Sequence, residues 1–120
     1  MSKEISSYRD LIVWQRSMEL VFAVYELTEK FPRSEQFGLT SQIRRAVVSI
    51  SSNIAEGKAR GSKKEYRQFL LTAYGSGAEL ETQITIAKHL PFSEHLNYEK
   101  IDIPLEEVMK MLNAIIQKLS

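Results

Sequence analysis

Apolar residues recur every three or four positions along most of the chain, which is the periodicity of α-helices with a buried face. Breaks near Pro32, Gly61 and Pro91 divide this pattern into four segments. The predicted helices span residues of about 8–30, 39–60, 62–89 and 104–119. A chain of this length forms one domain, residues 1–120, and short connections favour an all-α, antiparallel up-down-up-down four-helix bundle.

The first predicted helix carries two apolar stripes. The members of the two stripes are Leu11, Trp14, Met18, Val21 and Tyr25, and then Val13, Leu20, Val24, Leu27 and Phe31. Two stripes predict a helix that is buried on more than one side. Either this helix lies deep within its own bundle, or one stripe packs against another subunit, and the pattern leaves both interpretations open.

The connection between the second and third helices has recognisable end signals. Ser62 occupies the position of an N-cap, and Glu65 follows three residues later, as in a capping box. We expect Gly57 and Gly61 to loosen the end of the second helix and to permit a tight reversal.

Glycine and proline interrupt the last two helices. Gly75 and Gly77 each cost about 1 kcal/mol relative to alanine inside a helix, so we expect them to permit close approach of another helix. Pro104 removes one backbone hydrogen bond from the fourth helix. That helix is expected either to start near Pro104 or to follow a short earlier turn with a kink, and its firm part is 105–119.

The segment 42–60 holds more short polar side chains than a helix that only fills a core requires. In an antiparallel pair, its two arginines lie opposite two glutamates of the third helix. We favour a partly buried Arg–Glu pair that fixes the helix register over a contact with nucleic acid, although the pattern does not say which residues pair. The predicted polar network comprises Arg44, Arg45, Asn53, Glu56, Glu79 and Glu81.

Hydroxyl and amide side chains are spaced for hydrogen bonds between the second and third helices. They are Gln42, Ser49 and Asn53 on one helix and Thr72, Ser76 and Gln83 on the other. The alternative is that the serines only bond to local backbone carbonyls.

The face of the second helix opposite its core stripe is polar but small, and it comprises Arg45, Ser49, Ser52 and Glu56. Solvent would satisfy such a face. We instead expect a second buried surface, with Ser49 and Ser52 at an interface between subunits.

Charge is unevenly distributed along the chain. The net charge is +1 overall, but residues 44–67 hold seven Lys and Arg against two Glu, a local net charge of +5. Such a cluster indicates an anionic partner. The candidate nucleic-acid-binding residues are Lys58, Arg60, Lys63, Lys64 and Arg67. The alternative is a solvated turn with ordinary surface charge, and the register of Tyr66 places that ring in the core rather than in a stacking position.

The composition gives little support to catalysis. There is no cysteine, and His89 and His95 lie on either side of Pro91, which is not a helical metal-ligand pair. No phosphate-binding loop and no nucleophile–base arrangement is present. We therefore expect no enzyme, cofactor, metal or small-molecule substrate. The polar N-terminus and the lack of a long apolar run predict a cytoplasmic protein without a membrane span.

Several motifs occur in a fixed order. They are Leu11-x-x-Trp14, Phe31-Pro32, Phe37-Gly38-Leu39-x-x-Gln42-Ile43-Arg44-Arg45-Ala46, Ser49-Ile50-x-x-Asn53-Ile54-Ala55-Glu56-Gly57 and Ala73-x-Gly75-Ser76-x-x-Glu79-Leu80-Glu81-Thr82-Gln83. Over residues 8–119 the chain resembles the four-helix-bundle family encoded in intervening sequences of bacterial 23S ribosomal RNA genes. The lead-in to the fourth helix, 91–104, departs from the usual family pattern because prolines interrupt it.

The resemblance implies a small antiparallel bundle that assembles as a ring, typically a homopentamer, and no biochemical role is established for the family. It extends to the accessory variability protein of diversity-generating retroelements, which acts with nucleic acid and is strongly basic, unlike this chain. The sequence thus predicts a non-enzymatic ring-forming bundle that binds nucleic acid, in particular RNA, through 58–67. The alternative is a scaffold or protein-interaction module without a nucleic-acid role.

Overall fold

The computed structural model describes residues 7–120, which form helices and no strand. Two short 3-10 helices, η1 (Tyr8–Asp10) and η2 (Arg33–Glu35), accompany four α-helices. The α-helices are α1 (Ile12–Thr28), α2 (Leu39–Arg60), α3 (Lys63–Ala87) and α4 (Glu99–Lys118). They make an elongated body of 58 × 24 × 22 Å.

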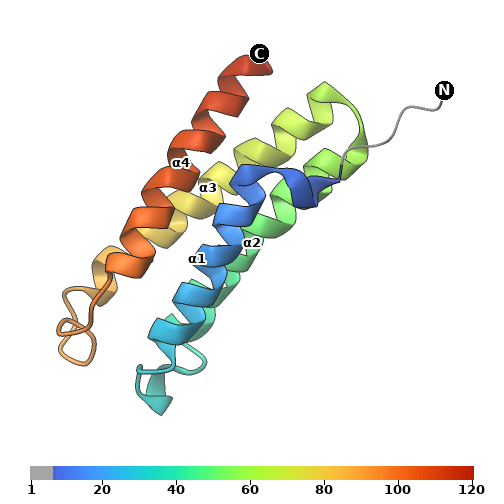
Figure 1. Ribbon diagram of the computed structural model, residues 1–120. Helices are drawn as coiled ribbons and strands as arrows, with labels where there is room; N and C mark the ends of the chain where they lie inside the picture. The colour runs from blue at the N-terminus through green and yellow to red at the C-terminus, as the bar shows by residue number, and fades with distance from the viewer. Residues whose placement is uncertain (1–6) are drawn as a thin grey trace.

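The four α-helices pack in chain order around one core (Figure 1). The backbones of α1 and α2, α2 and α3, α3 and α4, and α4 and α1 approach one another closely, whereas those of the diagonal pairs lie farther apart. The α2–α3 turn, the start of α1 and the end of α4 lie at one end of the bundle, and the other two connections lie at the opposite end (Figure 1). The predicted antiparallel four-helix arrangement is therefore present.

The apolar stripe Val13, Leu20, Val24, Leu27 and Phe31 is buried in the core, as a bundle helix requires. The other stripe of α1 is less covered, because Leu11, Trp14 and Met18 are only half-buried and Tyr25 is exposed. One stripe of α1 therefore remains partly available at the surface.

The boundaries of α1 differ from the predicted 8–30. At its start, Ser7 accepts a hydrogen bond from the Arg9 amide and closes η1, and the extended backbone of Leu11 (φ −75°, ψ 126°) separates η1 from α1. At its end, α1 stops at Thr28, three residues before the Phe31-Pro32 pair that was expected to end it.

The α2–α3 turn forms as its end signals predict. Gly61 adopts a left-handed conformation (φ 86°), which glycine tolerates without strain, and Ser62 accepts a hydrogen bond from the Glu65 amide at 3.1 Å. Since Ser62 is the cap, α3 starts at Lys63. The prediction that Gly57 loosens the end of α2 is wrong, because Gly57 lies buried within the helix against α3.

The expectation for α4 needs correction. The helix starts at Glu99, five residues before Pro104, and continues through the proline. Its first turn is anchored from outside: the Tyr98 carbonyl accepts hydrogen bonds from two helix amides, while the Tyr98 hydroxyl donates to the Ser93 carbonyl at 2.9 Å. Ser93 in turn donates to the Ala87 carbonyl at 2.6 Å, and this contact lies where α3 ends, two residues earlier than predicted.

Candidate nucleic-acid interface

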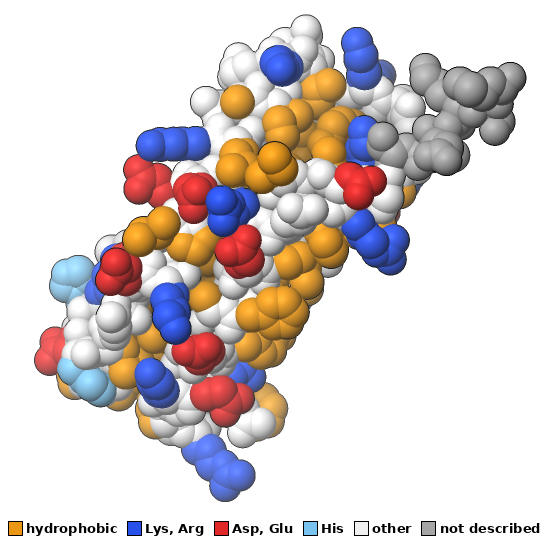
Figure 2. All heavy atoms as spheres, viewed as in Figure 1, with side chains coloured by type: hydrophobic (Ala, Val, Ile, Leu, Met, Phe, Trp, Pro, Cys, Tyr) orange, Lys and Arg blue, Asp and Glu red, His pale blue; other side chains and the backbone are white. Residues whose placement is uncertain are grey.

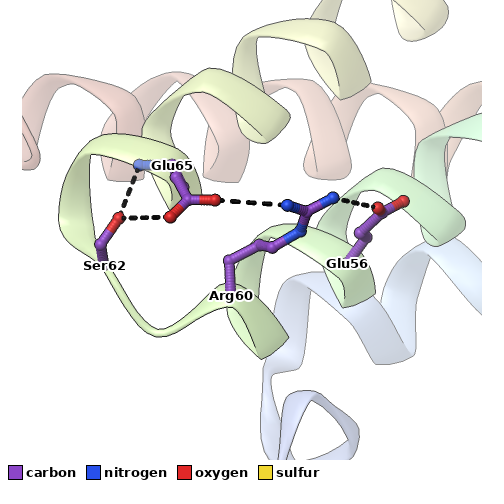
Figure 3. A network of polar contacts seen from close by, with 4 residues as sticks. All are labelled: Glu56, Arg60, Ser62 and Glu65. Carbon is purple, nitrogen blue, oxygen red and sulfur yellow. Dashed lines mark hydrogen bonds and ion pairs between the residues drawn. The ribbon is translucent and has the colours of Figure 1, made fainter.

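The α2–α3 turn holds a chain of polar contacts (Figure 3). Arg60 donates to Glu56 at 2.8 Å and pairs with Glu65 at 3.4 Å, and Glu65 also accepts from the Ser62 hydroxyl at 3.3 Å. The hydrogen bond that Arg60 donates to Glu56 raises the pKa of Arg60 above its usual value. Two carboxylates thus compensate the charge of this arginine, which reduces its attraction for an external anion.

Two further cations of the predicted cluster are engaged within the bundle. The Lys58 ammonium lies over the Tyr66 ring, 5.6 Å from its centroid. Tyr66 itself packs against the core, as its register predicts, and burial raises the pKa of its hydroxyl. The half-buried Arg67 donates from Nε to the Ile116 carbonyl of α4 at 3.3 Å. These side chains hold the end of the bundle together.

Lys63 and Lys64 differ from the other three cations. Both are exposed, and neither has an ion-pair partner among residues 7–120. They occupy the first turn of α3, where the helix dipole disfavours positive charge. Helix stability therefore does not account for these two lysines.

More positive charge gathers at the same end of the bundle. Arg9 precedes α1, and Lys118 is in the last turn of α4, so both lie at the end that carries the α2–α3 turn (Figure 1). Figure 2 shows several Lys and Arg side chains with few carboxylates beside them at this upper end, and side chains of both charges farther down the same face. The bundle end is thus a cationic surface in which Lys63 and Lys64 are the most available groups.

Arg44 does not pair with Glu79 or Glu81. Its Nε donates to the Thr28 hydroxyl at 2.9 Å, its guanidinium pairs with Glu29 at 3.4 Å, and the group stacks over Tyr25 at 4.5 Å. At about 100° per residue, position 44 lies roughly 140° around α2 from Ser49, which faces α3. The predicted Arg–Glu pair is wrong for Arg44 because this side chain faces α1.

Arg45 lies on the predicted side of α2 but makes no predicted pair. Arg45 and Glu79 line the same shallow groove with Gln42, yet both are exposed and no ion pair joins them. Glu81 lies elsewhere, beside Lys88 and Asp102 in a groove between α3 and α4. Within the described part of the chain, the helix register is therefore not fixed by these arginines and glutamates.

Serine and asparagine side chains do link α2 to α3. The hydroxyls of Ser49 and Ser76 are 2.8 Å apart, and the Asn53 amide donates to the Ser49 hydroxyl at 3.0 Å and to its carbonyl at 2.8 Å. The predicted hydrogen bonding across the helices is thus present at Ser49–Ser76. Thr72 instead bonds to its own helix, and the buried Gln83 carbonyl oxygen has no partner among residues 7–120.

This placement changes the proposed subunit surface. Ser49 is half-buried between α2 and α3, and its hydroxyl is engaged by Ser76 and Asn53 within the same bundle. Ser52 is exposed and lines an apolar surface groove of about 260 Å³, together with Trp14, Met18 and Val48. The groove lies between α1 and α2, and Ser51 at its floor shares a hydrogen bond of 2.8 Å with Ser17. The less covered stripe of the first helix signalled this groove in the sequence.

No group of three or more His, Asp or Glu side chains within 7–120 is arranged to hold a metal ion. Over the same residues, every helix is too short or too polar to cross a bilayer.

The fold and the cationic end define a small all-helical bundle protein with an exposed basic turn. The chain belongs to the family of 23S rRNA-intervening sequence proteins, because the family model matches residues 9–114. This match covers α1, α2, α3 and most of α4, and it confirms the family resemblance. A comparison with curated proteins gave no match.

Proposed function

We propose that this protein is a non-enzymatic, oligomeric helical bundle that binds nucleic acid, in particular RNA, through the α2–α3 turn. The observation that carries the proposal is the exposure of Lys63 and Lys64 without ion-pair partners in the described structure. Lysine side chains in this state attract phosphate, and binding to phosphates releases counterions. Arg60 and Arg67 act here mainly as structural groups, which narrows the predicted five-residue site to these lysines and their neighbours.

Oligomerisation has separate support from the surface between α1 and α2. Hydrophobic side chains are exposed along the visible face of the bundle in Figure 2. Trp14, Met18 and Ser52 line the apolar groove between α1 and α2. Contiguous exposed apolar surface of this kind is typical of protein contacts. A ring, such as the homopentamer implied by the family resemblance, would repeat the cationic end around one rim and strengthen the attraction for a polyanion.

An RNA titration at two salt concentrations tests the binding proposal. The wild-type protein should bind a structured RNA, and its affinity should fall as salt rises. The variant with Lys63→Glu and Lys64→Glu should bind more weakly and with a smaller salt dependence. A matched control carries Lys30→Glu and Lys100→Glu, which change the net charge equally but lie at the opposite end of the bundle. Absence of binding at low salt, or equal loss in both variants, contradicts the proposal.

Light scattering tests the oligomer independently of RNA. A mass near 13.8 kDa, that of one chain, would refute assembly. Met18→Glu should reduce the mass of an assembled form, because it places a charge in the apolar groove between α1 and α2.

The same surface favours one alternative function, a scaffold that binds another protein. Affinity capture followed by nuclease treatment separates the two. Partners that remain bound after nuclease digestion support the scaffold, whereas partners released by nuclease support the nucleic-acid role.

A further inference from the structure

A second groove lies between the end of α1 and the start of α2, away from the cationic turn. It is an open surface hollow of about 640 Å³, and its main lining residues are Tyr25, Phe37, Ser41, Arg44, Arg45 and Val48. The groove therefore combines two guanidinium groups, hydroxyls and aromatic rings. No Asp or Glu belongs to its lining.

Phe37 is the most unusual side chain of this groove. It is 91% exposed, more than any other large hydrophobic residue in 7–120, and it lies in the connection between η2 and α2. Burial of such a ring is worth roughly 1.5–3 kcal/mol, so its full exposure contributes nothing to the stability of the bundle. An aromatic ring presented to solvent beside arginine is the arrangement on which proteins stack unpaired bases.

The two arginines of the groove have different roles. Arg44 is fixed by Thr28, Glu29 and the Tyr25 ring, so its charge is partly compensated. Arg45 is exposed and forms no ion pair within the described residues, and Glu79 approaches it only from the neighbouring groove on the α3 side. The groove thus offers one uncompensated guanidinium, which suits a single phosphate.

We propose that this groove binds an unpaired nucleotide of a single-stranded nucleic acid, with the base on Phe37 and a phosphate on Arg45. The hydroxyl of Ser41 supplies a further donor at the groove floor. This inference rests on the proposed nucleic-acid role and specifies its substrate class as single-stranded. Residues 45 and 60 are about 22 Å apart along α2, at 1.5 Å per residue, so a strand that follows this helix reaches the cationic turn.

A planar ring distinguishes this occupant from an acidic peptide. A peptide carboxylate would pair with Arg45, but it has no group that requires the open face of Phe37. A base uses both features at once, because its π-face stacks on the ring while its phosphate meets the guanidinium.

Fluorescence titration with an oligonucleotide that carries 2-aminopurine at one position tests the proposal. Binding of the single strand to the wild-type protein should quench the fluorophore through stacking. Phe37→Ala should abolish the quenching and weaken single-strand binding about 5- to 150-fold, the equivalent of one stacked base. The matched control is Phe22→Ala, since Phe22 is also well exposed (66%) but lines no part of this groove.

A duplex of the same length provides the second arm. Phe37→Ala should leave the affinity for the duplex unchanged. The variant with Lys63→Glu and Lys64→Glu should bind both the single strand and the duplex more weakly. Arg45→Gln should make the slope of log K against log salt concentration shallower by about 0.7 for single-strand binding, which is the value for one phosphate. Helical circular dichroism of each variant verifies that the bundle is folded.

The outcomes separate the two proposals. If neither ligand binds the wild-type protein, the nucleic-acid role fails as a whole. If the single strand binds but Phe37→Ala behaves like Phe22→Ala, the groove proposal alone is overturned. If Phe37→Ala changes the mass measured by light scattering but not the affinity for the oligonucleotide, the groove proposal is also overturned, because Phe37 is then a contact between subunits.

Discussion

Gly57 of α2 and Phe69 of α3 pack so closely that a Cβ atom at position 57 would lie 2.6 Å from the Phe69 Cβ. Such a Cβ would also lie 3.3 Å from the Tyr66 carbonyl oxygen. The obstacle is therefore the stem of a side chain and the backbone of α3, neither of which moves easily. This contact holds the two helices together one turn before the cationic turn.

We expect Gly57→Ala to destabilise the protein. Overpacking costs about 1–3 kcal/mol, and alanine returns about 1 kcal/mol of helix propensity, so the free energy of unfolding should fall by about 0–2 kcal/mol. Urea unfolding followed by circular dichroism measures the change.

The two glycines of α3 provide graded controls for Gly57 of α2. Gly75→Ala meets nothing within 4 Å, so it should stabilise the protein by up to about 1 kcal/mol. Gly77→Ala meets the Met109 sulfur, which belongs to a flexible side chain, so its effect should lie between the other two. A Gly57→Ala protein as stable as the Gly75→Ala protein would contradict the close packing.

The Ser49–Ser76 hydrogen bond should contribute measurably to the α2–α3 contact. Ser76→Ala leaves the half-buried Ser49 hydroxyl without its partner on α3, and we expect a loss of about 1 kcal/mol. A double-mutant cycle with Ser49→Ala isolates the coupling energy. Ser34→Ala, at an exposed serine of η2, is the control and should be close to neutral.

Arg44 and Arg45 should respond differently to the same conservative change. Arg44→Lys keeps the charge but removes the Nε hydrogen bond to Thr28 and the stacking on Tyr25, so we expect a loss of about 1–2 kcal/mol. Arg45→Lys should be nearly neutral, because Arg45 is exposed and unpaired in the described structure. Equal unfolding midpoints for the two variants would show that Arg44 is not held as described.

Tyr98 predicts an alkaline limit of stability. Burial raises the pKa of its hydroxyl above the usual value near 10, so above that pH the unfolded chain releases a proton that the folded chain retains. The contribution of Tyr98 to the free energy of unfolding should be fully present below about pH 10 and should be lost as the pH rises toward the raised pKa.

Substitution of Tyr98 distinguishes its contribution to the alkaline loss of stability from that of the other tyrosines. Tyr98→Phe should cost about 1 kcal/mol near neutral pH, through loss of the hydrogen bond to Ser93, and should make the alkaline decline shallower. A residual decline remains because the pKa of Tyr66 is also raised by burial. Tyr74→Phe, at an exposed ring, is the matched control substitution. If the free energy of unfolding falls equally steeply with pH in Tyr98→Phe and in the wild type, Tyr98 is not a cause of the alkaline decline.

Local signals predicted the parts of the fold that local chemistry determines. The bounds of α2, the Ser62 cap and the turn at Gly61 follow from residues within a few positions of each feature. The close approach at Gly77 also followed, because a glycine inside an amphipathic helix needs a packing reason. By the same reasoning Gly75 was expected to be covered, but it is open to solvent.

Features that depend on distant residues were not predicted. The start of α4 depends on Tyr98 and Ser93, whose hydrogen bonds tie it to the end of α3. The partner of Arg44 depends on which side of α2 faces α1, and a one-residue difference in position decides this between Arg44 and Arg45. Likewise, five cations lie close together in the sequence near the turn. Only the structure shows that three of them already contact a carboxylate, an aromatic ring or a backbone carbonyl.

The two-residue turn between α2 and α3 has a consequence for the order of folding. Only Gly61 and Ser62 separate two helices of 22 and 25 residues, so little chain entropy is lost when they pair. The contact between α1 and α4 instead closes a loop that contains α2 and α3, so more chain entropy is lost when it forms. The hairpin that carries the cationic turn therefore closes through local contacts and needs no residue of α4.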